Sequence, residues 1–175
     1  MNIVLIGYRG VGKSSVGKAL AFRLEKRFVD TDDLLEERQQ APISEIVKSY
    51  GWEYFRKMEK RIIEEVSAQD HLVIAAGGGA VLDPENVMAL KRNGMILWLK
   101  AGRQVLHDRM AQDPRTVVQR PPLTGKGALE ELEEVMACRA PFYEKAMEAQ
   151  LDTSALDVSA VVESVLSILR ERNVI

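Results

Sequence analysis

A glycine-rich segment near the start of the chain constrains the fold more than any other feature. Residues 7–15, GYRGVGKSS, fit the pattern G-x-x-x-x-G-K-[ST]. The segment follows a continuous apolar run at 2–6 and precedes an amphipathic stretch at 14–27, in which apolar residues recur every four positions. A buried strand, a phosphate-binding loop and a helix are therefore expected in this order.

This pattern predicts a site for a nucleoside triphosphate. The backbone N–H groups of such a loop surround phosphate oxygens, helped by the dipole of the helix that follows. Lys13 would reach the β- and γ-phosphates, and the Ser14 hydroxyl would ligate Mg²⁺. The glycine spacing does not fit G-x-G-x-x-G, which disfavours a dinucleotide cofactor. The sequence also contains neither D-x-x-G nor N-K-x-D, which disfavours a regulatory GTPase.

The rest of the chain continues an alternation of strands and helices. Short apolar segments predict further strands at 28–30, 71–76, 94–99 and 149–154. Helical patterns occupy about 31–69, interrupted by Pro42 and Gly51, and then 84–92, 128–149 and 158–172. This alternation indicates a three-layer α/β/α sandwich with a five-stranded parallel sheet. With no repeat or linker, residues 1–175 are expected to form one domain.

Composition narrows the class of protein. The chain has 24 Lys and Arg against 26 Asp and Glu, a net charge of −2, so no basic surface is expected for nucleic acid or an anionic membrane. Cys138 is the only cysteine, which fits a reducing compartment. The N-terminus lacks the basic region of a signal peptide, and no apolar run approaches the roughly 20 residues of a membrane span. We expect a cytoplasmic protein and, by default, a monomer.

One loop is unusually long. Residues 112–127, QDPRTVVQRPPLTGKG, hold three prolines and two glycines with little apolar periodicity. Loops of this length inside a compact domain are usually either functional lids or disordered segments, and the prolines and the arginines favour the first interpretation here. A lid is therefore expected over about 112–125.

Charged residues suited to a small polyhydroxylated anion follow the second strand. In the segment VDTDD, Asp30 could hold the water shell of Mg²⁺ and Asp32 could accept a proton from an attacking hydroxyl. The alternative is helix capping, with Asp30 or Thr31 as N-cap and Asp32 and Asp33 in the first turn. The two interpretations are compatible.

Two arginines and a glycine turn are further candidates. Arg56 and Glu59 lie three apart, on one helical face, and would form either a surface ion pair or a cation site for a carboxylate. Arg139 precedes a proline, and taken singly it is an ordinary solvated arginine. The segment AAGGGAV at 75–81 indicates either a tight strand-to-helix turn or a place where a small molecule lies against bare backbone.

Six motifs occur in a definite order along the chain. They are GYRGVGKS at 7–14, DTD at 30–32, FRKME at 55–59, GGGAV at 77–81, RPPL at 120–123 and RAPFY at 139–143. Together with the LDTS strand and the closing helix, they resemble the shikimate kinases essentially from end to end. The phosphate loop alone is shared by many unrelated proteins, so the resemblance depends on the whole set.

The resemblance implies a fold of the P-loop kinase type and a specific reaction. Shikimate kinases transfer the γ-phosphate of ATP to the 3-hydroxyl of shikimate, a step toward chorismate and the aromatic amino acids. Shikimate and ATP would be the small-molecule partners and Mg²⁺ the cofactor. A helical segment at about 31–62 would bind the acceptor.

The resemblance also implies roles for individual residues. The catalytic set would be Asp32, Lys13 and the lid arginine Arg120. The acceptor would be bound by Asp32, Arg56, Glu59, Gly77, Gly78, Gly79 and Arg139. ATP would be bound by Gly10, Val11, Gly12, Lys13, Ser14, Ser15, Arg109 and Arg120. The Mg²⁺ site would use Ser14 and Asp30.

Two other functions stay open from the residues. Another small-acceptor kinase, of the gluconate or nucleoside monophosphate type, would share the donor site, although a nucleotide acceptor would need more lid arginines than Arg115 and Arg120. A non-catalytic relative would bind nucleotide or a partner only, and it would have no use for an acceptor aspartate such as Asp32.

Overall fold

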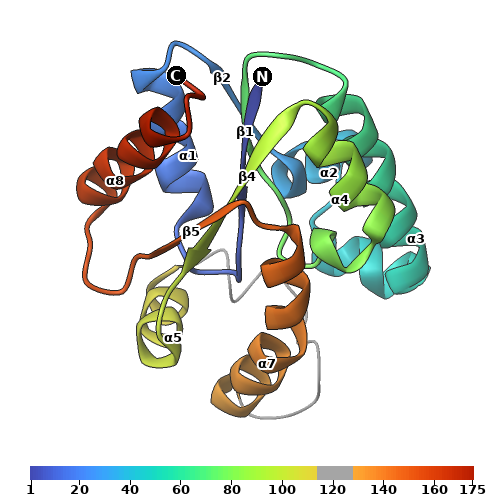
Figure 1. The fold of residues 1–175 in the computed structure, drawn as a ribbon. Helices are drawn as coiled ribbons and strands as arrows, with labels where there is room; N and C mark the ends of the chain where they lie inside the picture. The colour runs from blue at the N-terminus through green and yellow to red at the C-terminus, as the bar shows by residue number, and fades with distance from the viewer. Residues whose placement is uncertain (114–127) are drawn as a thin grey trace.

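A parallel sheet crosses the centre of the protein (Figure 1). The computed structural model describes residues 1–113 and 128–175, without the side chains of 128–130, so most of the expected lid and Arg120 lie outside the described residues. The strands are β1 (Asn2–Ile6), β2 (Arg27–Asp30), β3 (Leu72–Ala75), β4 (Gly94–Lys100) and β5 (Ala149–Asp152). They form a five-stranded sheet in the order β2-β3-β1-β4-β5, and every neighbouring pair is parallel.

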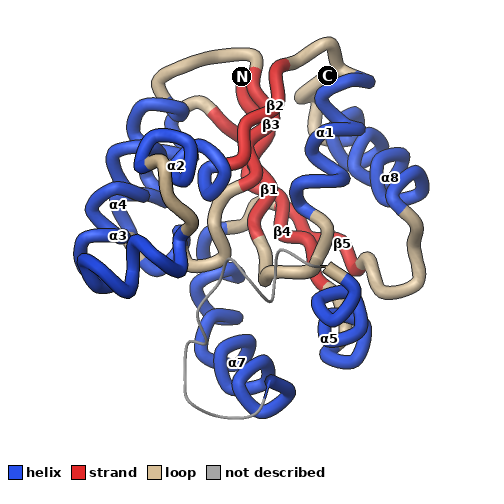
Figure 2. The backbone as a smooth tube through the Cα atoms, turned by 180° about the vertical axis from the view of Figure 1, so that it is seen from behind, coloured by secondary structure: helices blue, strands red, loops and turns tan. Residues whose placement is uncertain are grey.

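Helices cover both faces of this sheet, as the alternating sequence pattern predicted. In the described residues they are α1 (Lys13–Arg23), α2 (Thr31–Gln39), α3 (Ile43–Ser67), α4 (Pro84–Arg92), α5 (Arg103–Gln112), α7 (Ala128–Ala146) and α8 (Val158–Glu171), with a short 3-10 helix η1 (Ala80–Leu82). Helices α1 and α8 lie on one side of the sheet, and α2, α3 and α4 lie on the other (Figures 1 and 2). The result is the expected α/β/α sandwich.

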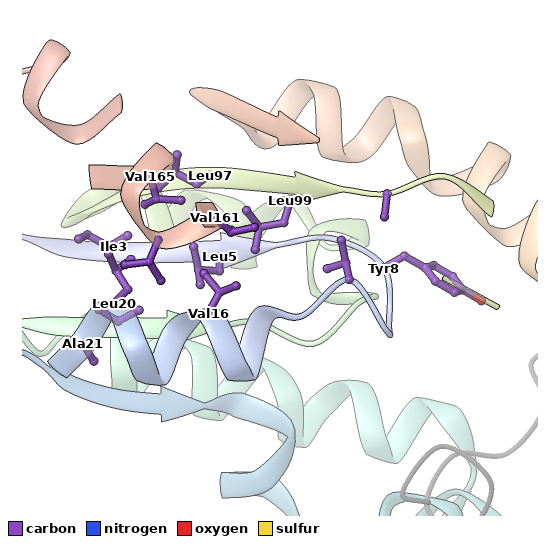
Figure 3. Packing of buried hydrophobic residues seen from close by; sticks show 14 of the residues in the cluster. Ile3, Leu5, Tyr8, Val16, Leu20, Ala21, Leu97, Leu99, Val161 and Val165 are labelled. Carbon is purple, nitrogen blue, oxygen red and sulfur yellow. The ribbon is translucent and has the colours of Figure 1, made fainter. Parts of the chain in front are cut away.

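The sheet separates two hydrophobic clusters because successive side chains of a strand point to opposite faces. Ile3 and Leu5 of β1 pack with Leu20 of α1 and Val165 of α8 (Figure 3). Val4 and Ile6 instead belong to the cluster on the side of α3 and α4. All five residues of β1 are buried. The continuous apolar run at 2–6 therefore correctly indicated a strand covered on both faces.

Helix α1 ends at Arg23, earlier than the predicted boundary at residue 27. The N–H of Lys26 donates to the carbonyl of Ala21 at 2.9 Å, and Glu25 between them has a φ of 51°. A left-handed residue inside such a hydrogen-bonded turn is a standard helix C-cap, and it reverses the chain. The N–H of Arg27 then donates to His71, so β2 begins at this residue.

The two interruptions predicted in the helical region are confirmed. Pro42 is the N-cap of α3, and Gly51 inside α3 has φ 80° and ψ 170°, which produces a kink. The kink divides α3 into a short part that follows α2 and a long part that carries Arg56. It therefore sets the direction from which this arginine approaches the sheet.

Helix α5 was not expected from the sequence. Only Leu106 and Met110, four residues apart, are buried on it, so the apolar stripe is too sparse to stand out. Helix α7 also ends at Ala146 rather than at residue 149, because the N–H of Glu148 donates to the carbonyl of Ile96 in β4 and Ala149 begins β5.

No helix within residues 1–113 and 128–175 has the length and apolar character needed to span a membrane.

The start of β4 gives a test of the packing. A Cβ at Gly94 would lie 2.7 Å from the carbonyl oxygen of Leu90 and 2.9 Å from a methyl carbon of Val4. We predict that Gly94→Ala lowers the free energy of unfolding by about 2 kcal/mol, the usual cost of forcing an atom into a packed core. Urea denaturation would measure the change.

Gly102→Ala is the matched control, because a Cβ there would meet only Ser154 Oγ, at an ordinary 3.7 Å. Equal loss of stability in the two alanine variants would show that crowding at Gly94 is not the cause.

Candidate active site

The phosphate loop lies between β1 and α1, at the carboxyl edge of the sheet, where open α/β sheets bind ligands. Gly12 is the N-cap of α1 and has a φ of 100°, a conformation that glycine adopts without strain. It provides no side chain to cap the helix, so the N-terminal N–H groups of α1 remain available to an anion. Lys13 Nζ donates across the loop to the carbonyls of Gly7 at 2.8 Å and Tyr8 at 3.2 Å.

A cavity of about 480 Å³ opens over this loop. Its walls include every predicted donor-site residue of the described chain: Gly10, Val11, Gly12, Lys13, Ser14, Ser15, Asp30 and Arg109. The far wall comes from Thr153, Leu156, Asp157, Val158 and Val161, at the start of the closing segment. The cavity therefore continues from the phosphate loop toward β5 and α8, which gives room for the rest of a nucleotide.

Ser14 and Asp30, the two residues predicted for the metal site, are in direct contact. Ser14 Oγ donates to Asp30 Oδ2 at 2.6 Å, and both residues line the cavity. Asp30 is also the N-cap of α2, where its Oδ1 accepts from the N–H of Asp32 at 3.0 Å and of Asp33 at 3.4 Å. The capping interpretation is thus confirmed, and it leaves Asp30 Oδ2 directed to Ser14.

The oxygen atoms of this pair suit Mg²⁺, which prefers hard oxygen ligands. Within the described residues no group of three or more His, Cys, Asp or Glu side chains could hold a metal ion by itself. An ion here would take its remaining ligands from phosphate oxygens and water, which is the usual arrangement for Mg²⁺ at a nucleotide site.

A second, smaller pocket adjoins the first. Its walls are Arg9, Asp32, Ile43, Trp52, Phe55, Arg56, Glu59, Gly78, Gly79 and Arg139. The structure therefore brings six of the seven predicted acceptor residues to one pocket, from four separate parts of the chain. Asp32 lines both pockets, so its carboxylate lies between the predicted donor and acceptor sites.

Arg56 and Glu59 form an ion pair at the base of this pocket. Arg56 Nη1 donates to Glu59 Oε2 at 2.6 Å, and the Arg56 guanidinium also lies over the rings of Trp52 and Phe55. Glu59 is only 2% exposed. Burial raises the pKa of the Glu59 carboxyl above its usual value, although the Arg56 charge opposes that shift. The pair is therefore not the solvated surface pair that spacing alone allowed.

Charged side chains approach the glycine turn most closely at Gly77 and Gly79. A Cβ at Gly77 would lie 2.6 Å from Asp32 Oδ1 and 2.8 Å from Glu59 Oε1, and a Cβ at Gly79 would lie 2.3 Å from Arg56 Nη2. Bare backbone is thus needed first by the protein's own charged side chains. Gly77 also donates its N–H to Thr31 Oγ1 at 2.9 Å and does not line the pocket, whereas Gly78 and Gly79 do.

Arg139 reaches the pocket from α7. Its guanidinium lies 6.0 Å from the ring centroid of Tyr8 in the phosphate loop, and its Nη1 would be 3.4 Å from a Cβ at Gly78. Arg56 and Arg139 therefore approach the glycine turn from different helices. Two guanidinium groups facing one small pocket can bind a carboxylate with paired hydrogen bonds.

Arg109 joins the phosphate loop to the strand at the end of the sheet. Its Nη2 donates to the carbonyl of Thr153 at 2.9 Å, and its Nη1 donates to Thr153 Oγ1 at 3.1 Å and to the carbonyl of Val11 at 3.4 Å. The side chain lines the larger cavity. Arg109 thus lies on the wall of the cavity predicted to bind ATP.

Three site residues were not singled out from the sequence. Arg9 lines both pockets, and its Nη2 pairs with the buried Glu131 Oε1 at 2.8 Å. Thr153 accepts a hydrogen bond from Arg109 through its carbonyl. Tyr143 donates from its hydroxyl to the carbonyl of Gly78 at 2.5 Å. Tyr143 and Thr153 stand inside the motifs RAPFY and LDTS, which was the available signal. Nothing in the sequence links Arg9 to Glu131.

Comparison with known proteins agrees with this geometry. The family model described as "Shikimate kinase" matches residues 9–170. The chain belongs to the shikimate kinase family. It is 41% identical to "Shikimate kinase 2" of Yersinia enterocolitica, over 99% of this chain and 98% of that protein. It is 39% identical to the "Shikimate kinase" of Syntrophus aciditrophicus, over 94% and 89% of the two chains.

Solved structures of the shikimate kinase family share the fold. The shikimate kinase of Acinetobacter baumannii, solved in complex with shikimate, superposes with a TM-score of 0.91 at 27% identity, over 98% of this chain and 93% of that one. A gluconokinase of Sinorhizobium meliloti reaches a TM-score of only 0.54 at 18% identity, over 97% and 91%. The gluconokinase likeness therefore shows a related fold and nothing about the acceptor.

Glu59 makes the stability of this shikimate kinase family member depend on pH. Because its pKa is raised in the folded state, the folded protein binds this proton more tightly than the unfolded chain does. The resulting stabilisation is complete below the usual pKa of 4.5 and is lost as the pH rises through the folded-state pKa. We predict that the stability of the wild type relative to Glu59→Gln falls over this interval, measured by urea unfolding at several pH values.

Glu65→Gln provides the control with the opposite sign. A hydrogen bond from Arg38 lowers the pKa of the Glu65 carboxyl, so its contribution to stability appears as the pH rises. If the Glu59→Gln difference follows the same direction as Glu65→Gln, burial does not dominate at Glu59.

Proposed function

We propose that this protein transfers the γ-phosphate of ATP to the 3-hydroxyl of shikimate. The observation that carries the proposal is the position of Asp32, which lines both the phosphate-loop cavity and the smaller pocket. A hydroxyl bound in the smaller pocket would meet the γ-phosphate beside this carboxylate. Membership of the family and the likeness to a shikimate complex support the choice of acceptor.

The acceptor pocket fits the chemistry of shikimate, a ring with one carboxylate and three hydroxyls. In the proposed complex, Arg56 and Arg139 bind the carboxylate, and the exposed backbone of Gly78 and Gly79 allows the ring to lie close. Glu59 holds Arg56 at 2.6 Å and keeps its guanidinium directed into the pocket. The acceptor hydroxyl is then directed to Asp32, which takes its proton as the new bond forms.

The donor site contributes mainly position and charge. Phosphoryl transfer passes through a loose transition state, so alignment and stabilisation of negative charge account for most of the acceleration. In the proposed complex, Lys13 and the N–H groups at the start of α1, which line the larger cavity, bind the β- and γ-phosphates. Ser14 and Asp30 would hold Mg²⁺, which supplies positive charge to the phosphate oxygens.

Several parts of the proposal rest on sequence alone. Arg120 and most of the lid at 112–125 lie outside the described residues, so closure of this arginine over the phosphates stays a prediction. We also propose that residues 1–175 act as one domain with an acceptor-binding segment at about 31–62. A cytoplasmic monomer without nucleic-acid or membrane partners remains part of this proposal.

A coupled assay of ADP release with Mg-ATP tests the reaction. Shikimate, quinate, gluconate and AMP are compared as acceptors, and turnover is expected with shikimate alone. Turnover with gluconate or AMP instead would support the predicted ATP site but would show that shikimate is not the acceptor. ATP binding without turnover for any acceptor would favour a non-catalytic relative.

The role of Asp32 is tested by Asp32→Asn. The amide cannot take the hydroxyl proton, so we predict a fall in kcat of about a hundredfold or more, with little change in the KM for shikimate. Steady-state kinetics with both substrates varied would measure the two effects separately.

Two further variants serve as controls for the Asp32→Asn result. Asp108→Asn, an exposed carboxylate on α5, is expected to keep wild-type kinetics. Arg139→Ala is expected to raise the KM for shikimate and leave the KM for ATP almost unchanged. Wild-type kcat in Asp32→Asn would show that this carboxylate is not the base.

A further inference from the structure

Tyr143 is a buried side chain on α7 that the reaction as described does not use. It is 3% exposed, and its ring stacks on Trp98 of β4 with a centroid distance of 5.4 Å and an interplanar angle of 24°. Its hydroxyl donates to the carbonyl of Gly78 at 2.5 Å. One side chain therefore connects α7, the sheet and the glycine turn.

This connection joins two walls of the acceptor pocket. Gly78 lines the pocket directly, and Arg139, which also lines it, precedes Tyr143 by four residues, or about one helical turn, on α7. The two walls come from segments more than sixty residues apart in the chain, as the separation of 65 between Tyr143 and Gly78 shows. A fixed contact near both is needed to keep Arg139 at a constant distance from the turn.

The helix itself cannot supply all of that rigidity. Pro141 lies inside α7, between Arg139 and Tyr143. Proline has no backbone N–H, so it removes a hydrogen bond of the helical ladder and weakens the turn that carries Arg139. The hydrogen bond from Tyr143 to Gly78 braces the helix against the sheet at this weak point.

The chemistry of the hydroxyl suits a permanent donor. Burial raises the pKa of Tyr143 to about 12, although the nearby Arg139 charge opposes that rise, so the group keeps its proton at physiological pH. The ring is held by Trp98, which limits its rotation. The carbonyl of Gly78 is thereby held in one orientation.

We propose that Tyr143 is a positioning residue for the acceptor. Its hydroxyl fixes the glycine turn relative to Arg139 and so sets the affinity of the pocket for the acceptor's carboxylate. This inference rests on the proposed function, because it assigns the pocket to the acceptor. It concerns the geometry of the pocket and not the transfer step. Loss of the hydroxyl should therefore weaken acceptor binding and leave chemistry and the donor site almost unchanged.

Tyr143→Phe tests the proposal, because phenylalanine keeps the ring that stacks on Trp98 and removes the hydroxyl, with its hydrogen bond to Gly78 and its contact with Arg139. Leaving a buried carbonyl without its donor is expected to raise the KM for shikimate about tenfold, with kcat and the KM for ATP within about twofold of wild type. Titration of shikimate followed by tryptophan fluorescence gives a second readout that does not require turnover, since Trp52 lines the pocket.

Tyr54→Phe is the matched control. Tyr54 also loses one hydrogen bond, its hydroxyl donating to Gln39 Oε1 at 3.0 Å, but it does not line the pocket. Trp98→Phe distinguishes the effect of ring packing from that of the hydroxyl, because it weakens the stacking on Tyr143 and keeps the hydrogen-bond donor. This variant should have a lower melting temperature than the wild type. Its KM for shikimate should change much less than that of Tyr143→Phe.

Each outcome decides the question. An unchanged KM and fluorescence titration in Tyr143→Phe, or a variant that fails to fold, would show that the hydroxyl serves stability alone and would overturn the inference. A rise in KM as large in Trp98→Phe would assign the effect to ring packing and would overturn it too. Absence of shikimate turnover and shikimate binding in the wild type would instead overturn the proposed function.

Discussion

The acceptor site depends on the absence of side chains at one turn. Between β3 and η1, the backbone at Gly77 and Gly79 is approached by Asp32, Glu59 and Arg56 to distances that no Cβ could share. Any larger residue there would displace the groups that are expected to bind and activate the acceptor. Glycine at positions 77 and 79 is thus a condition for assembling the charged cluster.

That cluster remains stable because its charges are paired and fixed. Glu59 is buried, and an isolated buried carboxylate would be costly, but Arg56 lies at 2.6 Å and the aromatic rings of Trp52 and Phe55 hold the guanidinium. Arg139 and Tyr143 close the other side from α7. The pocket is therefore preorganised by the protein's own contacts, which reduces the entropy lost when a ligand binds.

Local sequence patterns were sufficient to predict structure where the functional motif and its flanking elements are adjacent in the sequence. The apolar run at 2–6, the loop at 7–15 and the helix after it are adjacent in sequence, so the strand, phosphate loop and helix could be predicted directly. Asp30 was one of two candidate caps in the sequence and is the one that the structure uses, because capping is local. It lies beside Ser14 because the carboxyl ends of parallel strands share one edge. Helix α5 was not predicted because only two of its residues, Leu106 and Met110, are buried, which is too few to give a clear apolar periodicity.

The sandwich, the phosphate loop and the candidate charged residues of the site could be inferred from the sequence, since each depends on short-range periodicity or on a motif of fixed spacing. Tertiary packing was needed to show that Arg56 pairs with the buried Glu59 and that Arg9 pairs with Glu131. It also showed that Gly77 donates its N–H to Thr31 and leaves room for Asp32, while Gly77 itself stays outside the pocket wall. Apart from the Arg56–Glu59 pair within α3, these contacts join residues from separate elements, and burial, which sets their strength, is a property of the packed chain.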